Sequence, residues 1–255
     1  MKKKFSFLTS FLFLMIASLA TANAQEKKMA WTTSSSKASE LCKQGVDYFL
    51  NIEFAQAYEK FNAALELDPE FTVPLVLMTA ITGGELKKGF VARAANSTSD
   101  KTPGEQLFAS FASDKRDTAA ESSVFQKLYA MFPEDNMIGA LYVFTRRNPE
   151  DQLKSCEAYR KKFAGQAWTN NIIGYYYMTE KKDFAMAKKY FDAYIAEYPQ
   201  GCNPYDSMGE YYFNKKDKEN SKKYYEMSLD KYPFNNSAFN KLKEIKESSQ
   251  KKEGM

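Results

Sequence analysis

Residues 45–69 read GVDYFLNIEFAQAYEKFNAALELDP, and residues 209–233 repeat their pattern as GEYYFNKKDKENSKKYYEMSLDKYP. Each stretch has six pattern positions, separated by 3, 9, 4, 3 and 5 residues. In order, they hold a glycine, an aromatic residue, a small residue, a second aromatic residue, a second small residue and a proline. Glycine opposite a small residue lets two helices approach closely, and proline cannot continue a helix. The pattern therefore predicts helix pairs that each end at a proline. The positions are Gly45, Tyr48, Ala57, Phe61, Ala64 and Pro69, and then Gly209, Tyr212, Ser221, Tyr225, Ser228 and Pro233.

A third copy of the pattern ends 34 residues before Pro233. Its interval between the two small residues is 13 instead of 12, so we expect its turn at residues 180–183 to be one residue longer. The matching positions are Gly174, Tyr177, Ala187, Phe191, Tyr194 and Pro199.

This pattern resembles the tetratricopeptide repeat (TPR), which has the same order of small residues, aromatic residues and proline at a period of about 34 residues. The resemblance implies an all-α fold: a right-handed superhelical solenoid of about six TPR-like helix pairs plus a C-terminal capping helix. We expect Phe61 and Tyr225 to fill the space toward the next unit. Ser221 and Ser228 stand where the family usually has alanine.

The remaining units are placed by length and by helix breakers such as Gly83-Gly84, Pro103 and Pro149. Residues 236–248 are predicted to form the capping helix, with Phe239, Leu242 and Ile245 as its buried stripe, and residues 249–255 to be a frayed tail. The six predicted units span residues 38–71, 72–101, 102–135, 136–167, 168–201 and 202–235.

The first 24 residues have the three zones of a secretory signal: three lysines, an apolar run over 5–20, and Ala22-Asn23-Ala24 before the cleavage point. We expect the exported chain to begin at Gln25, to be periplasmic or secreted, and not to insert into a membrane after cleavage. An uncleaved anchor is the alternative, but a span needs about 20 apolar residues and this run is shorter. Residues 25–37 are expected to be flexible.

Charge and composition exclude several classes of function. Cleavage leaves 33 basic against 32 acidic residues, so the chain has no electrostatic footprint for nucleic acid. Histidine is absent from the sequence, which excludes histidine-dependent catalysis and histidine metal sites. We therefore expect no enzyme activity, no cofactor and no metal. The cysteines Cys42, Cys156 and Cys202 are interpreted as packing residues, with a Cys156–Cys202 bridge left open.

In the family that this sequence resembles, the first helix of each pair lines a concave groove that binds a peptide or a partner helix. The resemblance places Trp168, Asn171 and Tyr175 in the groove of the fifth unit. In the sixth unit it places Asn203, Asp206, Glu210 and Phe213 there, and in the first unit Ser39, Cys42, Val46 and Phe49. The lysine and asparagine clamp with which some members bind a terminal carboxylate is absent, because Cys42, Val46, Asp206 and Glu210 hold its places. Asp206 and Glu210 would instead prefer a basic or amide-rich segment.

These features predict a non-catalytic scaffold or adaptor of the cell envelope that binds a protein or peptide partner. The alternative is an envelope chaperone, or an accessory subunit of an enzyme complex, that holds extended polypeptides. The tyrosine-rich helices, such as Tyr175-Tyr176-Tyr177, are interpreted mainly as packing surfaces.

Overall fold

The computed structural model describes residues 27–115 and 117–253, with side chains described as far as residue 248. The predicted signal at 1–24 and the predicted first residue Gln25 lie outside these residues. None of the described helices is both long and apolar enough to cross a membrane.

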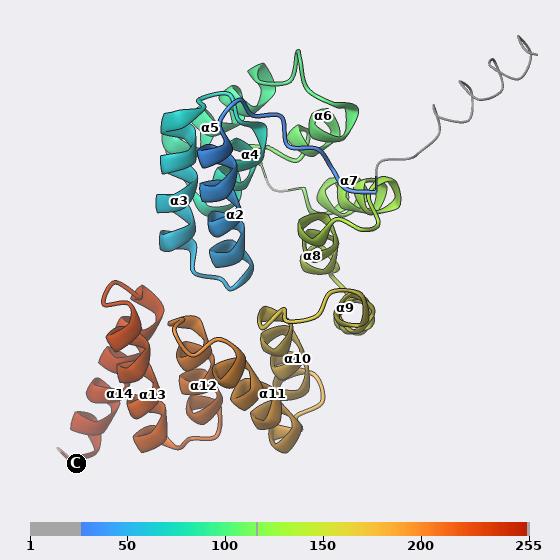
Figure 1. Cartoon of the computed structure of the whole chain (residues 1–255). Coiled ribbons are helices and arrows are strands. Elements are labelled where there is room, and N and C mark those ends of the chain that lie inside the picture. Colours follow the sequence, from blue (N-terminus) through green and yellow to red (C-terminus); the bar gives the residue numbers. More distant parts are fainter. Residues whose placement is uncertain (1–26, 116, 254–255) are drawn as a thin grey trace, which may run out of the picture.

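The described residues form thirteen helices and no strand (Figure 1). The first three pairs are α2 (Ser36–Leu50) with α3 (Phe54–Leu67), α4 (Thr72–Ile81) with α5 (Gly84–Asn96), and α6 (Pro103–Ala109) with α7 (Thr118–Met131). The next three are α8 (Asn136–Phe144) with α9 (Pro149–Lys162), α10 (Trp168–Thr179) with α11 (Phe184–Glu197), and α12 (Asn203–Asn214) with α13 (Lys218–Lys231). A last helix, α14 (Asn236–Glu253), follows them. The all-α arrangement of six TPR-like pairs and a terminal helix is thereby confirmed.

The signature glycines hold the regular pairs together by giving room to an aromatic ring. A Cβ atom added to Gly45 would lie 2.5 Å from the ring of Phe61, a distance that real Cβ contacts do not reach. Phe61 therefore packs on the glycine of its own pair, a contact that the expected packing toward the next unit did not include. The same contact would be 2.7 Å between Gly174 and Phe191 and 2.8 Å between Gly209 and Tyr225.

The two serines of the last pair keep the repeat packing although they replace alanine. Ser221 and Ser228 are fully buried, and each hydroxyl donates a hydrogen bond to a backbone carbonyl. The acceptors are the oxygens of Gly209 and Cys202, both at 2.9 Å. Because each buried hydroxyl has a partner, the substitution leaves no unsatisfied polar group.

The array bends so that its two ends approach each other. Figure 1 shows α2 to α5 at the top and α10 to α14 at the lower left, with α6 to α9 linking them on the right. At the closure, the Tyr194 hydroxyl of α11 lies 3.2 Å from the backbone oxygen of Asn51, in the turn between α2 and α3. This contact joins residues 143 positions apart, so the solenoid closes on itself and does not leave one open groove.

The N-terminal segment lies against the helices as an extended strap. The backbone nitrogen of Met29 donates to Asp135 at 3.1 Å, and that of Thr32 donates to Glu105 at 2.7 Å. The rings of Trp31 and Phe71 meet edge to face, 6.0 Å apart. The described part of the segment thus differs from the flexible stretch expected over 25–37, because the backbone nitrogens of Met29 and Thr32 and the ring of Trp31 have partners on the helices.

Helix α14 covers the end of the array with a stripe that keeps two of the three expected residues, Leu242 and Ile245, and has Ala238 in place of Phe239. Ala238 and Ile245 are buried beside the partly buried Leu242, and these residues follow at helical spacing on one face. Phe239 is 58% exposed, since it lies one position off that face. The helix also continues through Glu253, beyond the point at which we expected the tail to fray.

All three cysteines are buried and unpaired, so the Cys156–Cys202 bridge left open by the sequence is not formed. Burial raises the pKa of both these thiols to about 12. A thiol with so high a pKa stays protonated at neutral pH, which suits a packing residue.

Candidate binding cavities

The largest part of the predicted groove lies in a cavity of about 530 Å³ where the two ends of the array meet. We call it the closure cavity. Its walls are the α2–α3 turn on one side, and α10, α12 and the α13–α14 link on the other. It is lined by Ile52, Glu53, Phe54, Ala55, Gln56, Asn171, Tyr175, Cys202, Asn203, Asp206, Tyr232, Phe234, Asn235, Asn236 and Ser237.

Four of the seven groove residues predicted in the last two units line this cavity: Asn171, Tyr175, Asn203 and Asp206. Glu210 lies next to it and accepts a hydrogen bond from the Tyr175 hydroxyl at 2.7 Å. The first helices of the fifth and sixth units therefore present these side chains to one space.

Trp168 and Phe213 lie elsewhere. Trp168 is 2% exposed and stacks on Phe144 at 4.9 Å, so it is a packing residue and not part of an open groove. The ring of Phe213 packs near α14, with the Lys241 ammonium 4.4 Å from its centre. Each side chain packs against another helix, Trp168 against α8 and Phe213 against α14. The signature positions of the repeat do not predict where these two helices lie.

The polar floor of the cavity is held by hydrogen bonds between helices. Ser207 donates to the side-chain oxygen of Asn171 at 2.8 Å, which leaves Asn171 only 3% exposed. Asp206 accepts hydrogen bonds from Ser237 at 3.1 Å and from Asn235 at 3.3 Å. The floor is therefore fixed in place before any ligand enters.

Asp206 is an unusual carboxylate because it is only 8% exposed and no lysine or arginine is among the groups that shift its pKa. Burial raises its pKa to about 6, and the nearby Glu210 adds to the rise. The hydrogen bonds from Ser237 and Asn235 act in the opposite direction. At neutral pH the carboxylate is mostly ionised in a place that is unfavourable for charge.

The rim of the cavity is apolar and open to solvent. Ile52, Phe54 and Phe234 are 37%, 45% and 77% exposed. Large apolar side chains that gather around a polar floor are typical of ligand-binding sites.

The cavity is closed on one side by Glu53, which sequence reasoning missed. Glu53 is 3% exposed, and its carboxylate accepts hydrogen bonds from the backbone nitrogens of Cys202 at 2.6 Å and Asn203 at 3.3 Å. The Tyr198 hydroxyl donates to it at 2.9 Å. These amides belong to the N-terminus of α12, where a negative charge is favoured by free N–H groups and the helix dipole. We call this set of contacts the Glu53 bridge.

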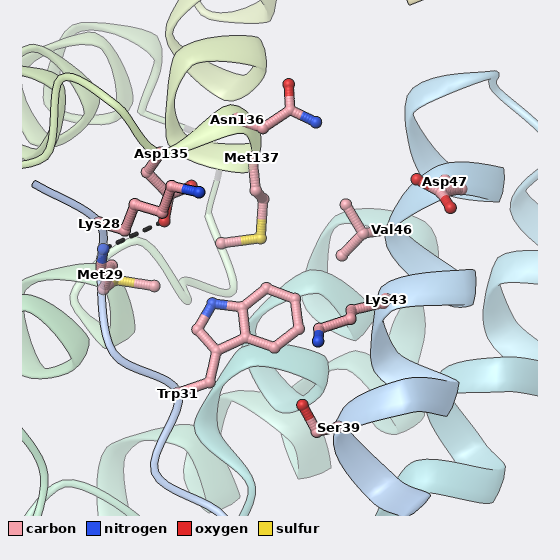
Figure 2. Close-up of a pocket in the computed structure, with 10 residues that line it drawn as sticks. All are labelled: Lys28, Met29, Trp31, Ser39, Lys43, Val46, Asp47, Asp135, Asn136 and Met137. Atoms are coloured by element: carbon pink, nitrogen blue, oxygen red, sulfur yellow. Dashed lines mark hydrogen bonds between the residues drawn. The ribbon is translucent and has the colours of Figure 1, made fainter. Parts of the chain in front are cut away.

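The first unit lines two other cavities. Figure 2 shows the N-terminal cavity, about 430 Å³, in which the Trp31 indole lies between Met137 of α8 and Lys43 of α2. Of the predicted groove residues, Ser39 and Val46 line it, whereas Cys42 is fully buried. The cavity carries both signs of charge, and its lining residues are Lys28, Met29, Trp31, Ser39, Lys43, Val46, Asp47, Asp135, Asn136 and Met137.

A second cavity of about 520 Å³, which we call the middle cavity, is lined by Phe49, the remaining groove residue predicted in the first unit. Ile52 and Phe54 line both this cavity and the closure cavity, so the two hollows flank the same turn. Across the middle cavity, Arg147 and Glu121 form an ion pair at 2.7 Å.

Within residues 27–115 and 117–253, no three cysteine, aspartate or glutamate side chains converge as a metal site would require. The closure cavity offers carboxylate and amide oxygens beside apolar rings, and such groups bind donors and apolar surface.

A scan against models of known protein families found no match to this chain, and a search of curated protein sequences found none either. Among solved structures, the chain is similar to one from the APC/C hetero-tetramer Cut9-Hcn1, with 15% identity and a TM-score of 0.46. The similarity covers 92% of this chain and 45% of that one, so the chain spans less than half of the Cut9-Hcn1 chain.

Two further solved structures are matched over almost their whole length. The chain is similar to PilF of Pseudomonas aeruginosa, with 14% identity and a TM-score of 0.42, over 82% of this chain and 97% of that one. It is also similar to YrrB, a TPR protein with an unusual peptide-binding site, with 14% identity and a TM-score of 0.38, over 89% and 97%. Similarities this distant carry no argument about function, and the TPR-like pairing rests on the helix contacts described above.

Proposed function

We propose that this chain is a non-catalytic scaffold of the cell envelope that binds an extended segment of a partner protein. The observation that carries the proposal is the closure cavity: a prearranged polar floor, from predicted groove positions, beside three exposed apolar side chains. Grooves of this kind take up extended chains by combining polar contacts to the backbone with apolar anchoring. A floor that carries only acidic charge favours selection of one kind of segment over general holding of unfolded chains.

The proposal is tested by selecting short random peptides, displayed on phage, against the purified chain. We expect the chain to enrich a family of peptides, and the double substitution Phe54→Ser with Phe234→Ser to abolish their capture. Both side chains are substantially exposed, so the variant should keep its fold, which circular dichroism checks.

Phe239→Ser is the matched control, because Phe239 is also exposed and apolar but does not line the cavity. It should select the same peptides as the parent chain. No enrichment by the parent chain, or equal capture by the double variant, would exclude the cavity as a protein-binding site.

We further propose that the protein is exported and matures at Gln25, on the strength of the three zones in residues 1–24. Mass spectrometry of the chain from its native cells should find an N-terminus at Gln25, in an envelope or external fraction. A chain that retains Met1 would contradict this.

A further inference from the structure

The three cavities differ in the sign of their charge. The N-terminal cavity is lined by two lysines and two aspartates, and the middle cavity by Lys87, Arg147 and Glu121. The closure cavity is lined by two acids, Glu53 and Asp206, and by no lysine or arginine among its described residues. Of the three, only the closure cavity presents negative charge alone.

The two acids of the closure cavity have different roles. The Glu53 carboxylate is already engaged within the chain, since it accepts hydrogen bonds from two backbone amides and a tyrosine hydroxyl. Asp206 accepts only two donors, one on each oxygen, and a carboxylate has about four acceptor sites. Asp206 therefore keeps capacity for a donor that comes from outside the chain.

A cation bound next to Asp206 would offset the cost of burying its negative charge. A buried charge without a counter-charge is costly, and the raised pKa of Asp206 has this cause. The ammonium of a lysine or the guanidinium of an arginine would supply both the missing charge and the missing donors.

The surroundings fit a polypeptide better than a small cation. The aliphatic stem of lysine or arginine packs on apolar surface, which Ile52, Phe54 and Phe234 supply at the rim. Ile52 and Phe54 also line the middle cavity, so a segment can continue past the turn into a second hollow.

We propose that the closure cavity receives a lysine or arginine side chain from an extended segment of a partner protein, with apolar neighbours of that residue packed on Ile52, Phe54 and Phe234. This inference rests on the proposed function and adds the chemical class of the segment. The site exists only when both ends of the array meet, because the first unit supplies Ile52 and Phe54, whereas the sixth unit supplies Asp206 and Phe234.

The test repeats the phage selection with Asp206→Asn, a substitution of nearly the same shape that removes the charge. Peptides selected by the parent chain should be enriched in lysine or arginine next to an aliphatic or aromatic residue. Asp206→Asn should lose that enrichment. Asp151→Asn, which removes an exposed carboxylate on α9 outside the cavity, should select as the parent does.

Affinity measurements on the best lysine peptide complete the test. Acetylation of its lysine should weaken binding to the parent chain by about tenfold or more, and should change binding to Asp206→Asn little. Equal binding of the acetylated peptide to the parent chain would overturn the inference. Spermidine binding to the parent chain as tightly as the lysine peptide would also overturn it, because the site would then take small cations.

The two levels of the proposal fail differently. If the parent chain selects neutral or acidic peptides that still need Phe54 and Phe234, the charge inference is wrong and the scaffold function stands. If it selects none, the proposed function itself is wrong.

Discussion

The turn of the first helix pair and the turn of the sixth pair have the same backbone and different contacts. In the first, the nitrogen of Ile52 donates to the oxygen of Phe49 at 3.0 Å; in the sixth, the nitrogen of Lys216 donates to the oxygen of Phe213 at 3.0 Å. Ile52 and Lys216 both have a left-handed conformation, with φ of 63° and 64°. The turn of the fifth pair also contains a left-handed residue, Lys182, with φ of 53°.

The acidic residue that follows the left-handed position differs between the units. Asp183 and Asp217 cap their own second helices, accepting hydrogen bonds from the nitrogens of Met186 at 2.9 Å and Asn220 at 3.1 Å. Glu53 stands at the same position and makes no such cap. Its longer side chain reaches the N-terminus of α12 instead. One additional methylene thus accompanies a change from capping a single helix to joining the two ends of the array.

The largest effect is expected from removing the Glu53 bridge. Glu53→Ala leaves the buried amide of Cys202, the amide of Asn203 and the Tyr198 hydroxyl without their acceptor, and should lower the free energy of unfolding by about 3 kcal/mol. Asp217→Ala removes a helix cap and the hydrogen bond that the Asn220 side chain donates to Asp217, and should cost about 1 kcal/mol. Urea unfolding of the two variants makes the comparison. Equal losses would mean that Glu53 contributes no more than a cap.

The next effect concerns Asp206, on the opposite wall of the closure cavity, where Ser237, Asn235 and Glu210 face it. Its pKa is raised from 3.8 to about 6 on folding, so the stability it contributes is fully present below pH 3.8 and is lost as the pH rises through about 6. This shift corresponds to about 3 kcal/mol as an upper value. Asp206→Asn should therefore gain stability over the parent chain between about pH 4 and pH 7. Unfolding curves with parallel pH dependence would contradict the burial of this carboxylate.

A smaller effect is expected at the signature glycines, and it shows whether the helix pairs of the first, fifth and sixth units pack alike although the contacts of their turns differ. Gly45→Ala, Gly174→Ala and Gly209→Ala each push a methyl group into an aromatic ring, so each should cost about 1–3 kcal/mol. Gly89→Ala has open space around its new methyl group and should be neutral or stabilising. Thermal midpoints of the four variants decide this. A harmless Gly45→Ala would show that the first unit packs differently from the other two.

The smallest effect is expected at the left-handed residue itself. Ile52 is β-branched, so φ of 63° strains it, and Ile52→Gly relieves the strain while losing apolar contact. These terms oppose each other, and the free energy of unfolding should change by less than about 1 kcal/mol. Lys216→Gly should be more stabilising, since it loses less apolar contact. Peptide capture should fall for Ile52→Gly and persist for Lys216→Gly. The reverse order would remove Ile52 from the site.

Most of the fold could be predicted because it depends on local sequence. Glycine, small residues and proline at fixed spacing determine where helices approach and end, and three of the six pairs follow from them. The other three units were placed by length and helix breakers, which do not fix the register of their helices, so the sequence could not predict the burial of Trp168 against Phe144 of α8. At the C-terminus, the sequence favoured the large Phe239 for the buried stripe, whereas the tight contact takes the small Ala238.

The site could be predicted only on one of its two walls. Asn171, Tyr175, Asn203 and Asp206 follow from the repeat register, because register places them on first helices. The opposite wall is about 150 residues away in the chain, and no periodicity connects the two. One sequence signal was available: aligning residues 45–69 with 209–233 sets Glu53 against Asp217, at a position where an aspartate would cap.

The most direct test of the account is the hydrogen exchange of the Cys202 and Asn203 backbone amides, followed by NMR. Amides at a helix N-terminus have no acceptor within their helix and ordinarily exchange quickly. If Glu53 closes the array, both amides should be protected in the parent chain and should exchange rapidly in Glu53→Ala, while the amides inside α12 stay protected. Rapid exchange of both amides in the parent chain would contradict the closure of the array.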